Sequence, residues 1–163
     1  MPTSTEYKLK LQPEGFYSID PLPAPAELAE FYAKLYYQAP QSATYHTEYT
    51  QEEIEQRYLR ARVTLHSIEA FTERRTNCEF LEVGCGEGFL LRTAHDSGYR
   101  VTGVDFSDVG LKRFNPSMAA HIETGNAFDI LDRLIGEKRL FDICVLQNVL
   151  EHVIDPRALI RQL

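Results

Sequence analysis

The chain has 163 residues, of which 44% are hydrophobic and 25% are charged, as expected for one globular domain. Its 17 basic and 24 acidic residues give a net charge of −7, so we expect no nucleic-acid partner, because phosphate backbones attract basic proteins. No apolar run is long enough to span a membrane, and no secretory signal opens the sequence. The odd number of cysteines (Cys78, Cys85 and Cys144) is typical of buried thiols in a reducing compartment. We therefore expect a cytoplasmic protein, without a membrane partner, that binds a small molecule.

Residues 1–75 are predicted to form an amino-terminal extension that is rich in proline and tyrosine. Prolines between residues 13 and 25 exclude a regular helix or a central strand there. A helix is predicted over 25–38, because a proline opens it and apolar residues recur every three or four positions. A capping-box pattern at Thr50 and Glu53 predicts a second helix that runs to about residue 72. Its apolar face consists of Ile54, Tyr58, Ala61, Leu65 and Ile68.

Residues 76–163 are predicted to form an α/β core. The strand candidates are short runs rich in branched and aromatic residues, at 78–84, 100–106, 121–125 and 141–147. Helical segments follow them at 87–97, 107–114, 127–135 and 156–163. Because the strand runs show little alternation between polar and apolar residues, we expect a parallel sheet that is buried on both faces.

Three glycines at alternate positions, Gly84, Gly86 and Gly88, directly follow the first of these strands. Such a turn lets a ligand approach the backbone closely and presents the start of the next helix to it, although an ordinary glycine turn is the alternative. A dinucleotide-binding turn would place its third glycine at Phe89. The carboxylate of Glu82, just before the turn, repels a pyrophosphate and attracts an ammonium group. The pattern therefore favours a ligand with a cationic amine.

The next two strands also end in residues that suit a nucleoside. Asp105 follows the second strand, where its carboxylate can accept hydrogen bonds from both hydroxyls of a ribose. Phe106 offers a flat face to an adenine ring, and Asn126, before Ala127, offers an amide to its polar edge. A helix cap is the alternative role for Asp105, and an ordinary turn residue the alternative for Asn126.

The segments LEVGCGEG, GVDFS, GNAFD and FDICVLQNVLEHVIDP occur in this order and together resemble class I S-adenosylmethionine-dependent methyltransferases. The resemblance implies a Rossmann-like parallel sheet with strand order 3-2-1-4, in which the carboxyl-terminal strands of the family are missing. It departs from the family at Asn126, where an aspartate is usual. The resemblance implies S-adenosylmethionine as the cofactor, bound by Glu82, Gly84, Cys85, Gly86, Gly88, Asp105, Phe106, Asn126, Ala127 and Gln147.

Methyl transfer from a sulfonium needs mainly alignment, and a general base is required only when the acceptor must lose a proton. His152 is the candidate for that base, and a structural role is its alternative. Some relatives bind a divalent cation through E-x-x-E-H, but this chain has Asn148 in place of the first glutamate. Because Glu151 and His152 alone make a weak site, we expect no metal.

The resemblance implies a methyltransferase that acts on a small molecule, such as a sugar or another hydroxyl compound. A non-catalytic module that binds S-adenosylmethionine or a nucleoside is the first alternative, and an NAD-dependent oxidoreductase is the second. The sequence stops soon after the fourth strand, so we expect a truncated fold or a homodimer formed through the exposed edge of 141–147. Helices before the first core strand often cover the pocket in this family, which makes the aromatic residues of the extension candidates for acceptor contacts, namely Tyr32, Tyr36, Tyr37, Tyr45 and Tyr49.

Overall fold

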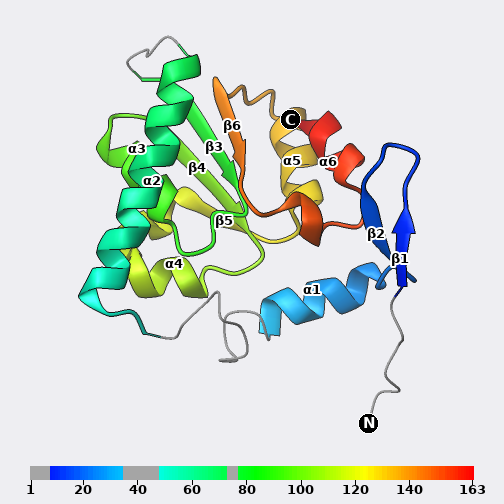
Figure 1. Cartoon of the computed structure of the whole chain (residues 1–163). Coiled ribbons are helices and arrows are strands. Elements are labelled where there is room, and N and C mark those ends of the chain that lie inside the picture. Colours follow the sequence, from blue (N-terminus) through cyan, green and yellow to red (C-terminus); the bar gives the residue numbers. More distant parts are fainter. Residues whose placement is uncertain (1–7, 35–47, 73–76) are drawn as a thin grey trace.

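The computed structural model describes residues 8–34, 48–72 and 77–163. An antiparallel hairpin and two helices precede the sheet (Figure 1), and they are β1 (Lys8–Leu11), β2 (Tyr17–Asp20), α1 (Pro25–Lys34) and α2 (Gln51–Phe71). The elements that follow are β3 (Glu79–Val83), α3 (Phe89–Asp96), β4 (Arg100–Asp105), α4 (Val109–Phe114), η1 (Pro116–His121), β5 (Ile122–Thr124), α5 (Ala127–Gly136), β6 (Ile143–Leu146), η2 (Leu150–His152) and α6 (Pro156–Gln162). None of the helices in the described ranges is long and apolar enough to cross a membrane.

The core is a four-stranded parallel sheet in the order β5-β4-β3-β6. With the strands numbered from β3, this is the predicted order 3-2-1-4, so the prediction of a Rossmann-like sheet is confirmed. Because all four strands run in the same direction, their carboxyl ends meet at one edge of the sheet. The glycine turn after β3 and the polar residues after β4 and β5 therefore lie at the same edge.

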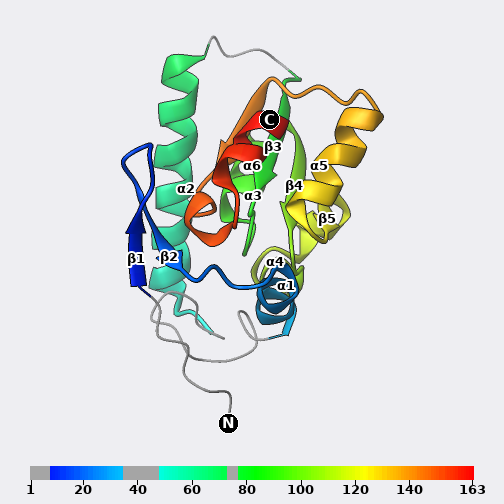
Figure 2. The same ribbon diagram turned by 90° about the vertical axis from the view of Figure 1, so that its right-hand side faces the viewer.

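Helices cover both faces of the sheet. Alternate side chains of β3 point to opposite faces, so Phe80 packs with α2, α3 and α4, while Leu81 and Val83 pack with α5 and α6. All three side chains are at most 1% exposed. Figure 2, a view turned by 90°, shows α2 and α5 on opposite sides of the sheet, and both views place α1 beyond the carboxyl ends of the strands.

Helix α2 forms as its sequence predicts. The Thr50 hydroxyl accepts a hydrogen bond from the Glu53 backbone N–H, and the Glu53 carboxylate accepts one from the Thr50 N–H. Of the predicted apolar face, Ala61 and Leu65 are buried, and the remaining members pack around them half-buried. The described part of the earlier helix ends at Lys34, so its predicted continuation over 35–38 lies outside the described residues. The same holds for the lid candidates Tyr36, Tyr37 and Tyr45, and for the side chain of Tyr32.

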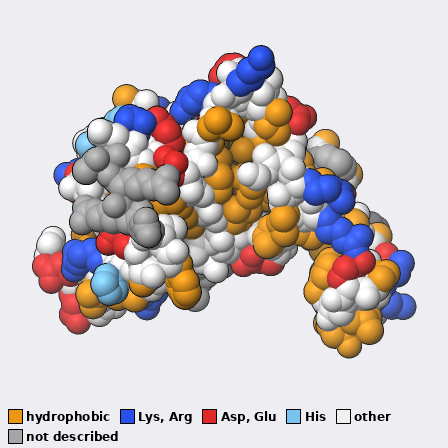
Figure 3. All heavy atoms as spheres, turned by 90° about the horizontal axis from the view of Figure 1, so that it is seen from above, with side chains coloured by type: hydrophobic (Ala, Val, Ile, Leu, Met, Phe, Trp, Pro, Cys, Tyr) orange, Lys and Arg blue, Asp and Glu red, His pale blue; other side chains and the backbone are white. Residues whose placement is uncertain are grey.

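The β1–β2 hairpin is an element that the sequence does not reveal. Its register pairs Leu9 with Ile19 and Leu11 with Tyr17, which places these four side chains on one face of the hairpin, where they stay exposed. Figure 3 shows the hairpin as a separate lobe with hydrophobic side chains at its surface. Two strands of four residues carry too little alternation to be recognised, although their arrangement agrees with the exclusion of a central strand from this segment.

The cysteines correct one expectation. Cys78 and Cys85 are buried, as predicted, but Cys144 is exposed. Its strand, β6, pairs only with β3 and therefore forms an edge of the described sheet, which leaves Cys144 less covered than a residue of a central strand. The predicted homodimer through this edge stays a prediction.

Candidate functional site

The turn between β3 and α3 requires its glycines. Gly84, Gly86 and Gly88 have φ values of 75°, 55° and 75°, in the left-handed region that side chains other than glycine rarely adopt. A Cβ atom on Gly84 would also lie only 2.3 Å from Cγ2 of Val149, in the loop after β6. The backbone of the turn is anchored to the sheet, because the Gly84 N–H donates to the Val104 carbonyl oxygen at 2.7 Å. The strand order thus brings the loop after β6 directly onto the turn.

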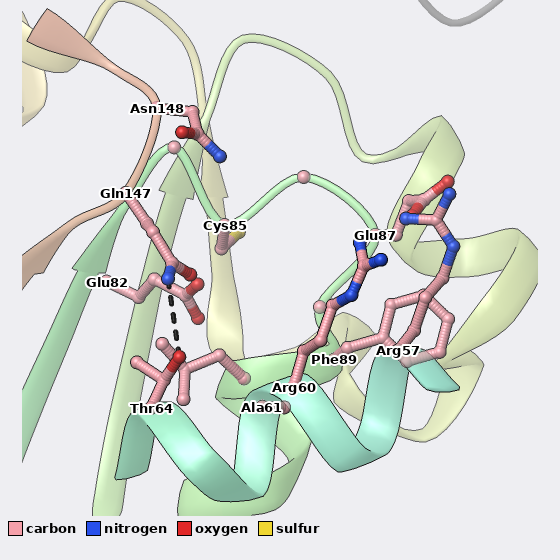
Figure 4. A pocket seen from close by; sticks show the side chains of 14 residues that line it. Arg57, Arg60, Ala61, Thr64, Glu82, Cys85, Glu87, Phe89, Gln147 and Asn148 are labelled. Carbon is pink, nitrogen blue, oxygen red and sulfur yellow. Dashed lines mark hydrogen bonds and ion pairs between the residues drawn. The ribbon is translucent and has the colours of Figure 1, made fainter. Parts of the chain in front are cut away.

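A cavity of about 230 Å³ lies between α2, the glycine turn and the end of β6 (Figure 4). From the sheet and the turn it is lined by Glu82, Gly84, Cys85, Gly86, Glu87, Gly88, Phe89 and Leu90. From α2 and the end of β6 it is lined by Arg57, Arg60, Ala61, Thr64, Gln147 and Asn148. Six of the ten predicted cofactor-binding residues are therefore brought together in one cavity.

Glu82 is the chemically unusual residue of this cavity. Its side chain is 5% exposed, and its Oε2 has no hydrogen-bond partner among the described residues. Burial raises the pKa of this carboxyl to about 8, and the negative charge of Asp105 adds to the increase. A buried acceptor without a partner is costly unless a ligand supplies one. The cavity therefore offers an unsatisfied site for a hydrogen-bond donor that carries positive charge.

Asp105 supports the turn from the end of β4. Its Oδ2 accepts a hydrogen bond from the Gly86 N–H at 2.8 Å, and its Oδ1 accepts one from the Ser107 N–H at 3.1 Å. Burial raises the pKa of Asp105, and these backbone hydrogen bonds partly oppose the increase. Each carboxylate oxygen has a further acceptor position, so Asp105 can fix the turn and still accept hydrogen bonds from a ligand.

The remaining predicted cofactor contacts lie at the ends of β4 and β5, outside the residues that line the cavity. Phe106 directly follows Asp105, which is paired in register with Thr124 of the neighbouring strand. Asn126 caps α5, because its Oδ1 accepts a hydrogen bond from the Phe128 N–H at 2.9 Å. Ala127 is the first residue of that helix. The sequence left an ordinary turn residue as the alternative role of Asn126, and the structure shows a helix cap instead. Its contact with adenine stays a prediction.

The candidate residues after β6 differ in position. The Gln147 side chain lines the cavity, and its Nε2 donates a hydrogen bond to the Thr64 hydroxyl of α2 at 3.3 Å. His152 is exposed in η2, where its Nε2 lies 4.0 Å from a carboxylate oxygen of Glu151, and it does not line the cavity. Its role as a general base stays a prediction.

Sequence reasoning missed the contribution of α2. Arg57, Arg60 and Thr64 all line the cavity, whereas the sequence predicted only the apolar face of this helix and no site residue on it. The available signal is spacing, since Arg57, Arg60 and Thr64 lie one turn apart and next to Ala61, which is buried. Figure 4 shows both arginine side chains extending from α2 toward the glycine turn.

Comparisons with known proteins agree on one family. A family model described as a methyltransferase domain matches residues 46–163. The chain is 32% identical over 104 residues to a ubiquinone biosynthesis O-methyltransferase of Idiomarina loihiensis, which covers 61% of this chain and 42% of that protein. It is 35% identical over 86 residues to the protein of the same name from Nitrosomonas europaea, covering 50% and 35% of the two chains. The chain thus spans less than half the length of these relatives.

The fold has a solved counterpart. A crystal structure of a SAM-dependent methyltransferase from Archaeoglobus fulgidus superposes with a TM-score of 0.52 and 21% identity, covering 65% of this chain and 46% of that one. This likeness shows the α/β fold, and the family model extends over most of the chain. The protein belongs to the methyltransferase domain family.

Proposed function

We propose that this chain binds S-adenosylmethionine against the glycine turn and takes part in methyl transfer to a hydroxyl group of a small molecule. The family supports the reaction class, and the names of the relatives, ubiquinone biosynthesis O-methyltransferases, support a hydroxyl acceptor. The observation that carries the proposal is the buried Oε2 of Glu82, which lacks a partner among the described residues.

The ammonium group of the cofactor fits this carboxylate. An ammonium donor beside Glu82 satisfies Oε2 and lowers the free energy of the ionised carboxyl, so that burial no longer keeps it protonated. A pyrophosphate at the same position would face a carboxylate instead of a cation. The charge of the site therefore favours an amino-acid tail over a dinucleotide.

The sugar fits the next strand end. Asp105 is held by the Gly86 and Ser107 N–H groups and keeps acceptor positions for two hydroxyl groups. A ribose bound there directs its base toward the ends of β4 and β5, where Phe106 and Asn126 lie. The glycines at 84, 86 and 88 keep the intervening surface free of side chains, which permits close approach to the backbone.

The carboxylate of the amino-acid tail fits Arg60. Arg57 forms an ion pair with Glu87 at 3.1 Å, whereas no acidic partner of Arg60 occurs within the part of the chain that the structure describes. Arg60 lines the cavity and extends toward the glycine turn (Figure 4). An arginine and a glutamate on opposite walls match the two charges of an amino-acid zwitterion.

The bound cofactor supplies an electrophilic methyl group, so the protein has to align the acceptor and exclude water. Gln147 stays a proposed cofactor contact, and Asn148 beside it is a neutral polar lining residue that can orient an acceptor hydroxyl. None of the lining residues that the structure describes is a histidine. We keep His152 as the proposed proton acceptor for the hydroxyl, and His152→Ala should lower turnover without changing cofactor affinity.

Calorimetry tests the proposed ligand. S-adenosylmethionine and S-adenosylhomocysteine should bind, NAD should not, and Asp105→Ala should weaken binding by about 2 kcal/mol because it removes a charged hydrogen-bond partner. Asp129→Ala, an exposed aspartate in the first turn of α5, is the matched control and should leave affinity unchanged. Binding of NAD alone would overturn the proposal.

Turnover separates an enzyme from a binding module. A cofactor carrying a labelled methyl group, incubated with phenolic, sugar and other hydroxyl compounds, should transfer the label to at least one class. Binding without transfer to any of them, in a protein that contains the whole chain, would favour the non-catalytic module over the methyltransferase.

A further inference from the structure

Glu87 is a buried carboxylate within the glycine turn, and the beginning of α2 holds its side chain. It lies between Gly86 and Gly88 and is 6% exposed. Its Oε1 accepts a hydrogen bond from the Tyr49 hydroxyl at 2.7 Å, and its Oε2 forms an ion pair with Nη1 of Arg57 at 3.1 Å. Both carboxylate oxygens therefore have partners among the described residues, and these two come from α2 and from the residue just before its cap.

The partners of Glu87 also contact each other. The guanidinium carbon of Arg57 lies 3.9 Å from the centre of the Tyr49 ring, within the range of a cation–π contact. The Tyr49 ring in turn packs against Phe114 at the end of α4, with 4.6 Å between ring centroids. We call the closed group formed by Tyr49, Arg57 and Glu87 the latch.

The backbone of Glu87 is held by a second route. Its carbonyl oxygen accepts a hydrogen bond from Nδ2 of Asn115 at 2.8 Å, and the Oδ1 of Asn115 accepts one from the Tyr58 hydroxyl at 2.5 Å. Asn115 is 1% exposed, so both of its hydrogen bonds are protected from water. Helix α2 thus contacts the side chain of Glu87 directly and its backbone through Asn115.

These contacts matter because the glycine-rich backbone of the turn has few conformational restraints of its own. The glycines on both sides of Glu87 have positive φ and no side chains to pack, so the backbone between them is intrinsically free. Asp105 fixes the turn at the Gly86 N–H, and the latch fixes it one residue later. The shape of the cavity wall formed by the turn therefore depends on two restraints, Asp105 from the sheet and the latch from α2.

We propose that Glu87 is a positioning residue that couples the beginning of α2 to the glycine turn and holds the cavity in the shape that receives the ligand. The ligand named here, S-adenosylmethionine, rests on the proposed function, whereas the coupling rests on the contacts of Glu87 alone. When the latch is broken, the turn becomes more mobile and α2 loses its direct contact with the Glu87 side chain.

Glu87→Gln tests the coupling, because glutamine keeps the size of the side chain but removes the charge that pairs with Arg57. In the ligand-free protein, amide hydrogen exchange over 84–89 should accelerate roughly tenfold more than exchange over β4 does. Dissociation of S-adenosylhomocysteine, followed by stopped flow, should also become roughly tenfold faster. A general loss of stability would accelerate exchange in both segments alike.

Two further variants keep the test decisive if Glu87→Gln does not fold. Arg57→Met removes the same ion pair from the α2 side and should reproduce both effects, whereas Arg57→Lys should restore part of them, because it keeps the charge. Glu55→Gln is the matched control, since it makes the same chemical change on the exposed side of α2 and should change neither readout.

Unchanged exchange over 84–89 in both Glu87→Gln and Arg57→Met would overturn the coupling. If the unaltered chain does not bind S-adenosylhomocysteine, the proposed function fails, and exchange in the ligand-free protein still decides whether the latch orders the turn. If the unaltered chain binds the ligand, and the latch variants show the same exchange and dissociation rates as the unaltered chain, the proposed function stands and the coupling is wrong.

Discussion

Two glutamates at the glycine turn are equally buried but differ in their hydrogen-bond and ion-pair partners. Glu82, before the turn, is 5% exposed, and its Oε2 has no partner within the described ranges. Glu87, inside the turn, is 6% exposed, and both of its oxygens are paired by Tyr49 and Arg57. A buried carboxylate with complete partners organises structure, whereas one with a missing partner is suited to a ligand of opposite charge.

The contrast has an electrostatic consequence. Burial and the charge of Asp105 raise the pKa of Glu82 to about 8, so this carboxyl is mostly protonated at neutral pH without a ligand. An ammonium group placed beside it reverses the balance and favours the ionised form. We therefore expect Glu82 to act on ligand binding directly, and Glu87 to act on stability and, through the shape of the turn, on ligand dissociation.

The largest expected effect is on binding. Glu82→Ala removes the proposed partner of the ammonium group. It should weaken the binding of S-adenosylhomocysteine by about 3 kcal/mol, roughly a hundredfold. Titration calorimetry measures it, with Glu79→Ala at the start of the same strand as the control. Undiminished affinity in Glu82→Ala would place the amino-acid tail elsewhere.

The second effect is the pH dependence of stability. A carboxyl whose pKa is higher in the folded chain stabilises the fold at low pH, and this contribution is lost as pH rises from its unfolded pKa toward its folded pKa. For Glu82 the loss should be on the order of 2–3 kcal/mol between about pH 5 and about pH 8. Glu82→Gln should abolish that part of the decline in urea unfolding measured across this range. An identical decline in both proteins would contradict the assigned surroundings of Glu82.

The third effect is a loss of stability at neutral pH when Glu87 is removed. Glu87→Ala removes the ion pair with Arg57 and should lower the free energy of unfolding by about 2 kcal/mol, less than for a fully buried pair because the Arg57 side chain is 26% exposed. Denaturant unfolding at neutral pH measures the loss. If Glu87→Ala were as stable as the unaltered chain, the two glutamates would not differ as described.

The smallest effect concerns the carboxylate of the tail. Arg60→Met keeps the length of the side chain but removes its charge, and it should weaken binding by about 1 kcal/mol because Arg60 is exposed to solvent. The loss should shrink as salt is added, since salt screens exposed charges. Arg62→Met, an exposed arginine that does not line the cavity, should have no effect at any salt concentration.

Most of the fold could be predicted because its signals are local. The apolar strand runs, the Thr50–Glu53 capping box and the glycine turn each identify an element, and the parallel order follows from strands that alternate with helices. The β1–β2 hairpin has no such signal in its short strands. Cys144 was predicted to be buried because its run, FDICVLQ, is apolar, but burial of an edge strand depends on its neighbours rather than on its own residues.

The only site residues that could be predicted are those that the sheet topology places at the carboxyl ends of its parallel strands. Glu82 and Gln147 follow from the rule that parallel strands end at one edge of the sheet. Arg57 and Arg60 could not be assigned, because a helical period gives the buried face of α2 but not the position of that helix over the glycine turn. The pairing of Glu87 with Tyr49 joins positions that are 38 residues apart, which no local pattern encodes.

Proton release on binding tests the central claim most directly. If the ammonium group of S-adenosylhomocysteine docks beside Glu82, binding at about pH 7 should release close to one proton per ligand, because a carboxyl with a pKa of about 8 becomes ionised. Calorimetry in two buffers of different ionisation enthalpy measures this number, and Glu82→Gln should release none. Binding by the unaltered chain without proton release, or with the same release in Glu82→Gln, would contradict the account.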